Sequence, residues 1–392
     1  MEEGKSDIKL RLYSEQDIDK IIDLLKPNWT YLQSPEGVRY WKWLYTGYKG
    51  GKAIVFVADH RGKIVGHYAM LPMKMRYGNS TILGGKSEGS AIDRDYRGNV
   101  AERFCPQEKE FWIFGSLIDL LWREATSSHV SLIWGFPNAT SVNPHVRAGY
   151  SLHRMKVHSL VMPFNVRGTI DWYYSRAPLK GSVRRAFLSF MRGYCRLRMK
   201  RKALDRNKSA TTDVGFRRIS QEDLDGRLER FLEAYHNENR QITIERDSNY
   251  IRWRFMDNPV VPHRVYVSER NGEYTSLVVV DTPIKDGEIA VNIVDIVARK
   301  GFDDDLKGLL CDIAIKLRNE KAACIRVWFN DCRQSKLYIK TLRRIGFVGL
   351  PTSLIGRKQN FLFKYLGSSL DRRFGEDPEN WYITEAFKEG TY

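Results

Sequence analysis

The sequence lacks any run of about 18 consecutive apolar residues, the length that spans a bilayer. Its first residues, MEEGKSDIKLRLYSEQD, contain no basic stretch followed by an apolar one, so we expect no signal peptide and a cytoplasmic location. The five cysteines are an odd number without a C-x-x-C pair, which argues against a disulfide framework and against a zinc site. We therefore expect reduced thiols and no bound metal.

Positive charge is abundant but concentrated in one segment. The chain of 392 residues has a formal net charge of +17. Residues 176–208 contain twelve Lys and Arg residues against the single acidic residue Asp205. Apolar spacing predicts a basic helix over 180–204, within a linker at 166–212. Three roles are open to it: a solvated linker, contact with an anionic membrane surface, or contact with nucleic acid, which is the least favoured.

The two halves of the chain repeat a series of motifs in the same order. Four matches in one order indicate an internal duplication. We therefore expect two similar domains, at residues 1–165 and 213–392. The matching pairs are Tyr40 to Trp43 with Tyr250 to Trp253, the turns Arg61-Gly62 and Asn271-Gly272, the strands SLIWGFPN (131–138) and CIRVWFN (324–330), and Gly149-Tyr150 with Gly346-Phe347.

Each half combines strand and helix patterns. Residues 53–59 and 63–70 alternate as strands on either side of a glycine turn, which predicts a hairpin. Residues 116–125 and 305–320 carry apolar side chains every three or four positions, which predicts helices. We expect the α/β fold class, of the α+β type, with a mixed sheet in each of two tandem domains.

The motifs of the first half resemble those of tandem N-acyltransferases of the GNAT superfamily, of a bacterial type associated with polysaccharide biosynthesis. The matching residues are Tyr40 to Trp43, Val65-Gly66-His67, Asp95 to Gly98, and Gly135 to Asn138. The resemblance implies transfer of an acyl group, here expected to be acetyl, from acetyl-CoA to a small amine. It also implies an amino sugar of a surface-polysaccharide precursor as the acceptor, met at the inner face of the membrane.

The resemblance implies a binding site for the acyl-CoA donor at the end of a long strand, here near Ser90 to Ile92. In this fold the strand parts from its neighbour and leaves backbone groups free to pair with the pantetheine arm of CoA. The following turn and helix N-terminus then face the pyrophosphate. The residues implied as donor contacts are Ser90, Ala91, Ile92, Arg97, Gly98, Phe114, Gly115 and Asn138.

The phosphate loop admits two alignments. Read without gaps, residues 97–102 lack the later glycines and place Glu102 where it would repel a phosphate. Read with an insertion over residues 99–112, the pattern resumes at Phe114-Gly115 and a helix follows from Ile113. We prefer the insertion, because the apolar spacing after Ile113 matches the expected helix.

Amine acylation needs a base for the ammonium proton and an acid for the leaving thiolate. Glu88, on the long strand, is the candidate base; its other interpretation is an exposed strand residue. His145 occupies the position where the family often has a tyrosine acid, and Tyr150 is the rival candidate. For His145 a capping role, and for Asn138 an Asx turn, are the structural alternatives.

The second half departs further from the phosphate pattern. Its loop continues into Asp303, Asp304 and Asp305, which would repel a phosphate, so we expect the C-terminal domain to be non-catalytic.

Two other functions of the protein remain open. One is a Fem-type transferase that uses aminoacyl-tRNA, for which the basic segment would suit tRNA. The other is a non-catalytic GNAT-like scaffold or ligand-binding protein.

Overall fold

The structure is a computed structural model. It describes residues 7–99, 112–165, 214–281, 284–285, 288–349 and 358–388, with isolated positions at 168, 169, 189 and 193. The predicted insertion at 99–112 therefore lies mostly outside the described residues, and so does the predicted linker at 166–212 with its basic helix. Among the described helices, none is long and apolar enough to cross a membrane.

The described chain forms two compact units. Unit 1 comprises residues 1–155 and 359–376, and unit 2 comprises residues 156–358 and 377–392. The predicted domain boundaries remain a prediction, and they did not anticipate the return of residues 359–376 to the first unit. The predicted α/β class with mixed sheets is confirmed, because each unit contains one sheet with antiparallel and parallel pairs.

Unit 1 is a sheet with helices on it, ordered β1-β2-β3-β4-β5-β16-β6. Helix α4 packs its buried Leu117, Ile118 and Leu121 against Tyr68 and Met70 of the sheet. The elements are β1 (Ile8–Leu12), α1 (Ile18–Leu25), α2 (Gly37–Thr46), β2 (Ile54–His60), β3 (Lys63–Gly78), β4 (Ser80–Ile92), α4 (Ile113–Ser127), β5 (Leu132–Gly135), α5 (Val142–Arg147), β6 (Ser151–Met155), β16 (Gln359–Tyr365) and α13 (Arg372–Glu376).

Unit 2 repeats this plan, with its sheet in the order β15-β7-β14-β13-β11-β10-β8. Its core joins strands β11, β13 and β14 to helices α10 and α11. The elements are β7 (Val157–Pro163), β8 (Val214–Ile219), α8 (Gly226–Glu238), β9 (Gln241–Ile244), α9 (Ser248–Ile251), β10 (His263–Arg270), β11 (Glu273–Asp281), β12 (Ile284–Lys285), β13 (Glu288–Ala298), α10 (Asp303–Asn319), β14 (Cys324–Asn330), α11 (Arg333–Ile345) and β15 (Val348–Gly349).

The repeated hairpin turns have the same backbone geometry in both units. Arg61 and Gly62 have φ angles of 52° and 87°, and Asn271 and Gly272 have φ angles of 52° and 79°. Two residues with positive φ twist a hairpin in the sense that its strands require. The predicted hairpins are therefore confirmed, with β2 paired to β3 and β10 paired to β11.

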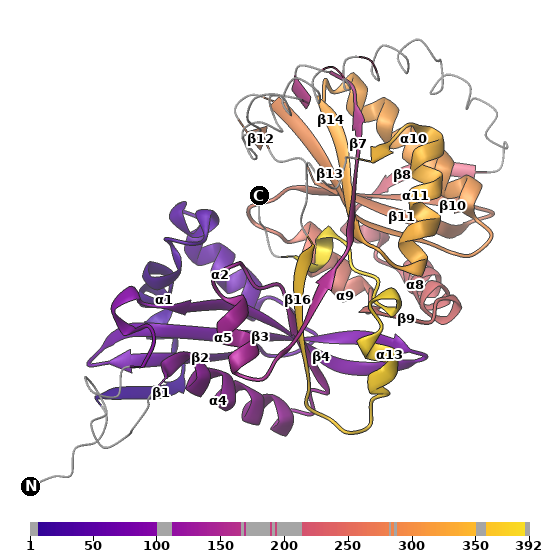
Figure 1. Ribbon diagram of the computed structural model, residues 1–392. Coiled ribbons are helices and arrows are strands. Elements are labelled where there is room, and N and C mark those ends of the chain that lie inside the picture. The colour runs from indigo at the N-terminus through magenta and orange to yellow at the C-terminus, as the bar shows by residue number, and fades with distance from the viewer. Residues whose placement is uncertain are drawn as a thin grey trace, which may run out of the picture. The chain divides into compact units, whose positions relative to one another are not determined.

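Each half of the sequence contributes one strand to the other unit. Strand β16, yellow in Figure 1, lies among the purple strands of unit 1, between β5 and β6. Strand β7, magenta in Figure 1, lies among the orange strands of unit 2, between β14 and β15. The exchange explains why the compact units do not follow the chain as two uninterrupted segments.

Replacing Leu362 of β16 by Ala should destabilise unit 1. The side chain is 1% exposed and belongs to the core under α4, so the loss should be about 2–5 kcal/mol. Hydrogen exchange should become faster in β5 and β6, while β10 and β11 of unit 2 keep their rates. Leu337→Ala on α11, 52% exposed, is the control. Unchanged exchange in β5 and β6 would contradict the exchanged-strand arrangement.

Candidate functional site

Strands β4 and β5 are paired for only part of their length. They pair in parallel from Gly84 with Leu132 to Lys86 with Trp134. Beyond this point β4 continues to Ile92, and within the described residues no strand pairs with the edge that faced β5. The last residues of β4 therefore have no strand partner on this edge among the described residues.

A bulge at Gly89 accompanies the parting of the two strands. The register between β3 and β4 shifts between His67 and Ala69, and Gly89 has a φ of +61°. A Cβ atom at Gly89 would lie 2.6 Å from the Tyr45 hydroxyl. The imidazole Nδ1 of His67, which is fully buried, lies 2.6 Å from the carbonyl oxygen of Gly89. Only glycine suits this position, because it combines positive φ with close neighbours.

A short turn carries β4 towards helix α4. Asp93 caps the turn by accepting the N–H of Asp95, and its carboxylate pairs with Lys63 at 2.7 Å. Arg97 is exposed, and its Nε donates to the Ile92 carbonyl at 3.2 Å. Gly98 follows with a φ of +84°. The guanidinium of Arg97 is thus fixed at the exit of β4.

Helix α4 starts at Ile113, which confirms the predicted helix start. The N-cap residue Trp112 makes no side-chain capping hydrogen bond, and the first turn of the helix contains no acidic residue. The first backbone N–H groups of a helix have no intrahelical acceptor, and the helix dipole favours an anion there. The start of α4 is therefore suited electrostatically to a phosphate.

These elements enclose a pocket of about 210 Å³ in unit 1. It collects seven of the eight residues predicted to contact the donor: Ser90, Ala91, Ile92, Arg97, Gly98, Phe114 and Asn138. Gly115 is the exception. A Cβ atom there would lie 2.4 Å from the ring of Trp112, so this glycine serves the packing of Trp112 on the helix start.

The pocket also contains residues that the sequence interpretation did not assign to it. Trp112 had been counted in the insertion, yet it lines the pocket, and Arg147 lies over its ring at 4.7 Å. Thr140 and Ser141 lie two and three residues after Asn138, so the sequence Asn-Ala-Thr-Ser could have indicated them. The remaining lining residues are Asn28, Trp29, Tyr96 and Pro144.

Asn138 shapes the loop after β5. Its side-chain oxygen accepts the N–H groups of Thr140 at 3.1 Å and Ser141 at 2.9 Å. This is the Asx turn named as its structural alternative. Because Asn138 also lines the pocket, the turn places the N-terminal end of α5 at the site.

His145 is buried beneath the pocket and does not line it. Its ring lies 4.9 Å from that of Phe114 and 5.4 Å from that of Tyr150, and its Nδ1 lies 2.6 Å from the Ser141 carbonyl oxygen. Burial lowers the pKa of His145 to about 4. The imidazole is therefore neutral near pH 7, which does not favour the proton-donating role predicted for it.

Tyr150 is buried in the same cluster. Its hydroxyl lies 2.9 Å from that of Tyr68 and accepts the indole N–H of Trp122 at 3.2 Å. Burial raises the pKa of Tyr150 to about 12. The hydroxyl therefore keeps its proton at neutral pH, although it does not line the pocket.

Glu88 lies on the other face of the sheet. Cross-strand neighbours share a face, so Ser87 lies on the side of its partner Met70, which packs in the α4 core. Glu88, one residue on, is on the opposite side. Its carboxylate pairs with the ammonium of Lys86, and the two side chains are 10% and 6% exposed. Glu88 is therefore a mostly buried, paired carboxylate and not an exposed strand residue.

Unit 2 has a corresponding opening, where strands β13 and β14 stop pairing, and residues 381–387 of the chain occupy it. Strands β13 and β14 pair only as far as Ile293 with Val327. Beyond this, residues 381–387 lie against β14: Thr384 bridges Phe329, and Asn330 donates its side-chain N–H to the Trp381 carbonyl at 2.7 Å. On the β13 side, the Tyr382 hydroxyl donates to the Ile296 carbonyl at 2.7 Å.

The filled opening of unit 2 is held by a buried ion pair. Arg246 donates to both carboxylate oxygens of Asp295, at 2.7 and 2.9 Å, and both side chains are almost fully buried. Asp295 also accepts the hydroxyl of Thr384 at 3.1 Å. The C-terminal segment is thereby tied to β13, in the place where β4 of unit 1 has no strand partner among the described residues.

The start of α10 is acidic where the start of α4 is not. Asp303, Asp304 and Asp305 form its first turn. Asp305 is buried and accepts from Arg270 at 2.5 Å and from the Thr275 hydroxyl at 2.9 Å. These carboxylates would repel a phosphate at the start of α10, whereas the start of α4 in unit 1 has no acidic residue to do so.

Replacing His145 by Gln should flatten the dependence of stability on pH. The pKa of His145 is about 4 in the folded protein and about 6.5 in the unfolded chain. As the pH falls, this histidine is therefore protonated in the unfolded chain before it is protonated in the folded protein. Stability should therefore fall between about pH 6.5 and pH 4, and removing His145 should reduce the loss from pH 7 to pH 5 by about 1–2 kcal/mol. Urea unfolding at both pH values measures this. His129→Asn, at an exposed histidine, is the control; equal slopes in the wild type and His145→Gln would contradict the neutral buried imidazole.

The sequence matches no protein-family model and no curated protein. The structure is similar to a GCN5-related N-acetyltransferase from Anabaena variabilis, with a TM-score of 0.57 at 11% identity, covering 92% of this chain and 73% of that one. A GCN5-related N-acetyltransferase from Kribbella flavida gives 0.54 at 12% identity, covering 92% and 71%. N-myristoyltransferase of Saccharomyces cerevisiae with bound myristoyl-CoA gives 0.52 at 12% identity, covering 93% and 84%. The chain has the fold of the GCN5-related N-acetyltransferases, as its motifs predicted.

Proposed function

We propose that the protein is an N-acyltransferase that moves an acetyl group from acetyl-CoA to an amine at the unit 1 pocket. The observation that carries the proposal is the parting of β4 from β5 directly before a turn with Arg97 and an acid-free helix start. The similarity in fold to an enzyme solved with bound myristoyl-CoA supports an acyl-CoA donor.

The donor would bind in two parts. The amides of the pantetheine arm would pair with the free edge of β4 around Ser90 to Ile92. The pyrophosphate would meet the guanidinium of Arg97, the backbone at Gly98 and the N-terminus of α4. Phe114 and Asn138 would border the arm from the other side, because both line the same pocket.

Transfer would be direct, without a covalent enzyme intermediate. The ammonium of the acceptor gives a proton to Glu88, and the free amine attacks the thioester carbonyl. The new C–N bond forms, the C–S bond breaks, the nitrogen loses its second proton, and the departing thiolate takes up a proton. The face that Glu88 shares with the buried Lys86 would then be the acceptor side of the sheet.

For the acid we propose Tyr150 in preference to His145. The hydroxyl of Tyr150 holds a proton at neutral pH, whereas the imidazole of His145 is neutral and enclosed by aromatic rings. Tyr68 and Trp122 orient this phenol to donate a hydrogen bond to the developing thiolate. Because a thiol is a stronger acid than a phenol, the Tyr150 proton would pass to sulfur only while the nitrogen of the new amide returns a proton to the tyrosine oxygen.

We propose unit 2 as a non-catalytic copy, supported by the segment 381–387 in its opening and by the acidic start of α10. As acceptor we propose an amino sugar of a surface-polysaccharide precursor, on the motif resemblance described above. A protein active at such a precursor would work in the cytoplasm or at the inner membrane face.

Replacing Arg97 by Ala should weaken acetyl-CoA binding about 10- to 100-fold, because one charge-assisted contact to a phosphate is lost. Isothermal titration calorimetry with acetyl-CoA measures the change. The matched control is Arg94→Ala, which removes the same charge from the same turn at a residue outside the pocket lining. Equal affinities of the wild type and Arg97→Ala would remove Arg97 from the donor site.

Replacing Glu88 by Gln should lower kcat by about 100-fold or more and leave the affinity for acetyl-CoA nearly unchanged. Steady-state acetylation of an amine acceptor measures kcat. Lys86→Gln is the matched control, since it breaks the same ion pair but keeps the carboxylate. A base role predicts that only Glu88→Gln is slow; equal losses in the two variants would give the pair a structural role instead.

A further inference from the structure

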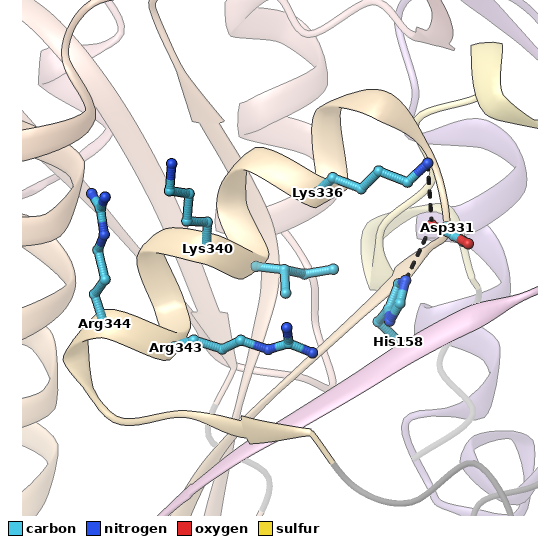
Figure 2. Close-up of a pocket in the computed structure, with 7 residues that line it drawn as sticks. His158, Asp331, Lys336, Lys340, Arg343 and Arg344 are labelled. Atoms are coloured by element: carbon cyan, nitrogen blue, oxygen red, sulfur yellow. Dashed lines mark ion pairs between the residues drawn. The ribbon is translucent and has the colours of Figure 1, made fainter.

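Unit 2 contains a second cavity, of about 540 Å³, whose lining is strongly basic. Four cations of α11 line it, together with His158 of β7, Ile339 and a single carboxylate, Asp331 at the end of β14. Figure 2 shows these side chains around the helix and the strand. The cations are Lys336, Lys340, Arg343 and Arg344.

The sequence of α11 separates an apolar face from a basic one. Tyr338, Leu342 and Ile345 are buried against the sheet of unit 2. The four cations lie on the exposed side, and RQSKLYIKTLRRI contains no acidic residue. Like charges three or four residues apart repel one another on a helix, so the row of cations is unfavourable for α11 by itself.

The carboxylate of the cavity is already engaged. Asp331 lies 3.2 Å from Nε2 of His158 and 3.9 Å from Nζ of Lys336 (Figure 2). Lys336 also pairs with Glu379 at 2.8 Å. Across the described ranges, no carboxylate lies within ion-pair distance of Lys340 or Arg344. The cavity therefore keeps positive charge that the described protein does not neutralise.

The duplicated fold does not require this charge. The corresponding helix of unit 1, α5, has six residues, and its only basic side chains are the buried His145 and Arg147, which lies over Trp112. The two helices correspond in the fold, because α5 follows β5 and α11 follows β14, and each of these strands is the one that parts from its parallel neighbour. Of these two corresponding helices, only α11 of unit 2 is long and basic.

We propose that this basic cavity binds a diphosphate group, carried either by a soluble molecule or by a lipid. Lys340 and Arg344, which have no carboxylate within ion-pair distance among the described residues, leave a charge of +2 at the cavity, which suits a diphosphate better than a singly charged anion. The volume is that of a small-molecule site. No Phe, Tyr or Trp ring is among the described lining residues, so the large aromatic platforms on which the bases of single-stranded nucleic acid stack are not provided.

The probe for the test is inorganic pyrophosphate, measured by calorimetry in the full-length Arg97→Ala protein so that the unit 1 pocket contributes little. Pyrophosphate should bind, and Lys340→Gln with Arg344→Gln should weaken it about tenfold or more, because two charge-assisted contacts are lost. The matched control is Lys307→Gln with Arg318→Gln on α10, which removes the same charge from the same unit and should change affinity less than about twofold. Acetyl-CoA affinity of otherwise wild-type protein should be unchanged by either pair, which separates this inference from the proposed function.

A second arm distinguishes the two sources. Phosphatidylcholine vesicles doped with a polyprenyl diphosphate should bind, in competition with pyrophosphate, if the group is carried by a lipid. Binding of free pyrophosphate without binding to these vesicles assigns a soluble carrier. Three results would overturn the inference: no pyrophosphate binding, an equal loss in the α10 control, or vesicle binding that any anionic lipid supports and pyrophosphate does not compete.

Discussion

The site depends on one constraint: β4 cannot stay paired with β5 beyond Lys86. Gly89 adopts a positive φ where any side chain would collide with Tyr45 and His67, and the register with β3 shifts at the same place. The strand therefore bends, its last residues keep β3 on one edge, and no described strand pairs with the other edge. An edge of this kind is costly inside a protein unless water or a ligand meets it. The turn at Arg97 and the uncapped start of α4 add positive charge at the end of that edge.

The two units solve the same structural problem in different ways. In unit 1 the parted strands border a pocket, whereas in unit 2 residues 381–387 occupy the opening and are tied to β14 and to Asp295. The two copies thus differ in whether the chain itself occupies the gap between the parted strands. The exchanged strands β7 and β16 also place sequence from each half in the sheet of the other unit, so neither unit is complete without both halves of the chain. Unit 2 in turn carries the basic cavity along α11, which unit 1 lacks.

Local signals in the sequence sufficed for part of this arrangement. The turns at Arg61-Gly62 and Asn271-Gly272 fix their hairpins through backbone angles that few other residues adopt, and the apolar spacing from Ile113 identified the start of α4. The residues near Arg97 and Asn138 that were predicted to contact a donor line one pocket because each follows a strand at the same edge of the sheet. The strand exchange could not be predicted, because alternating residues in 359–365 show that a strand forms and not which sheet accepts it. Nor could the burial of His145 be predicted, since it follows from the distant rings of Tyr68 and Phe114.

Hydrogen exchange of the full-length protein with and without acetyl-CoA tests the central claim most directly. The claim is that one donor site exists, at the free edge of β4 in unit 1. Binding should slow exchange in residues 87–98 and 138–144 and leave residues 294–298 and 381–387 of unit 2 unchanged. Slower exchange at the unit 2 opening, or no protection anywhere at saturating acetyl-CoA, would contradict the account.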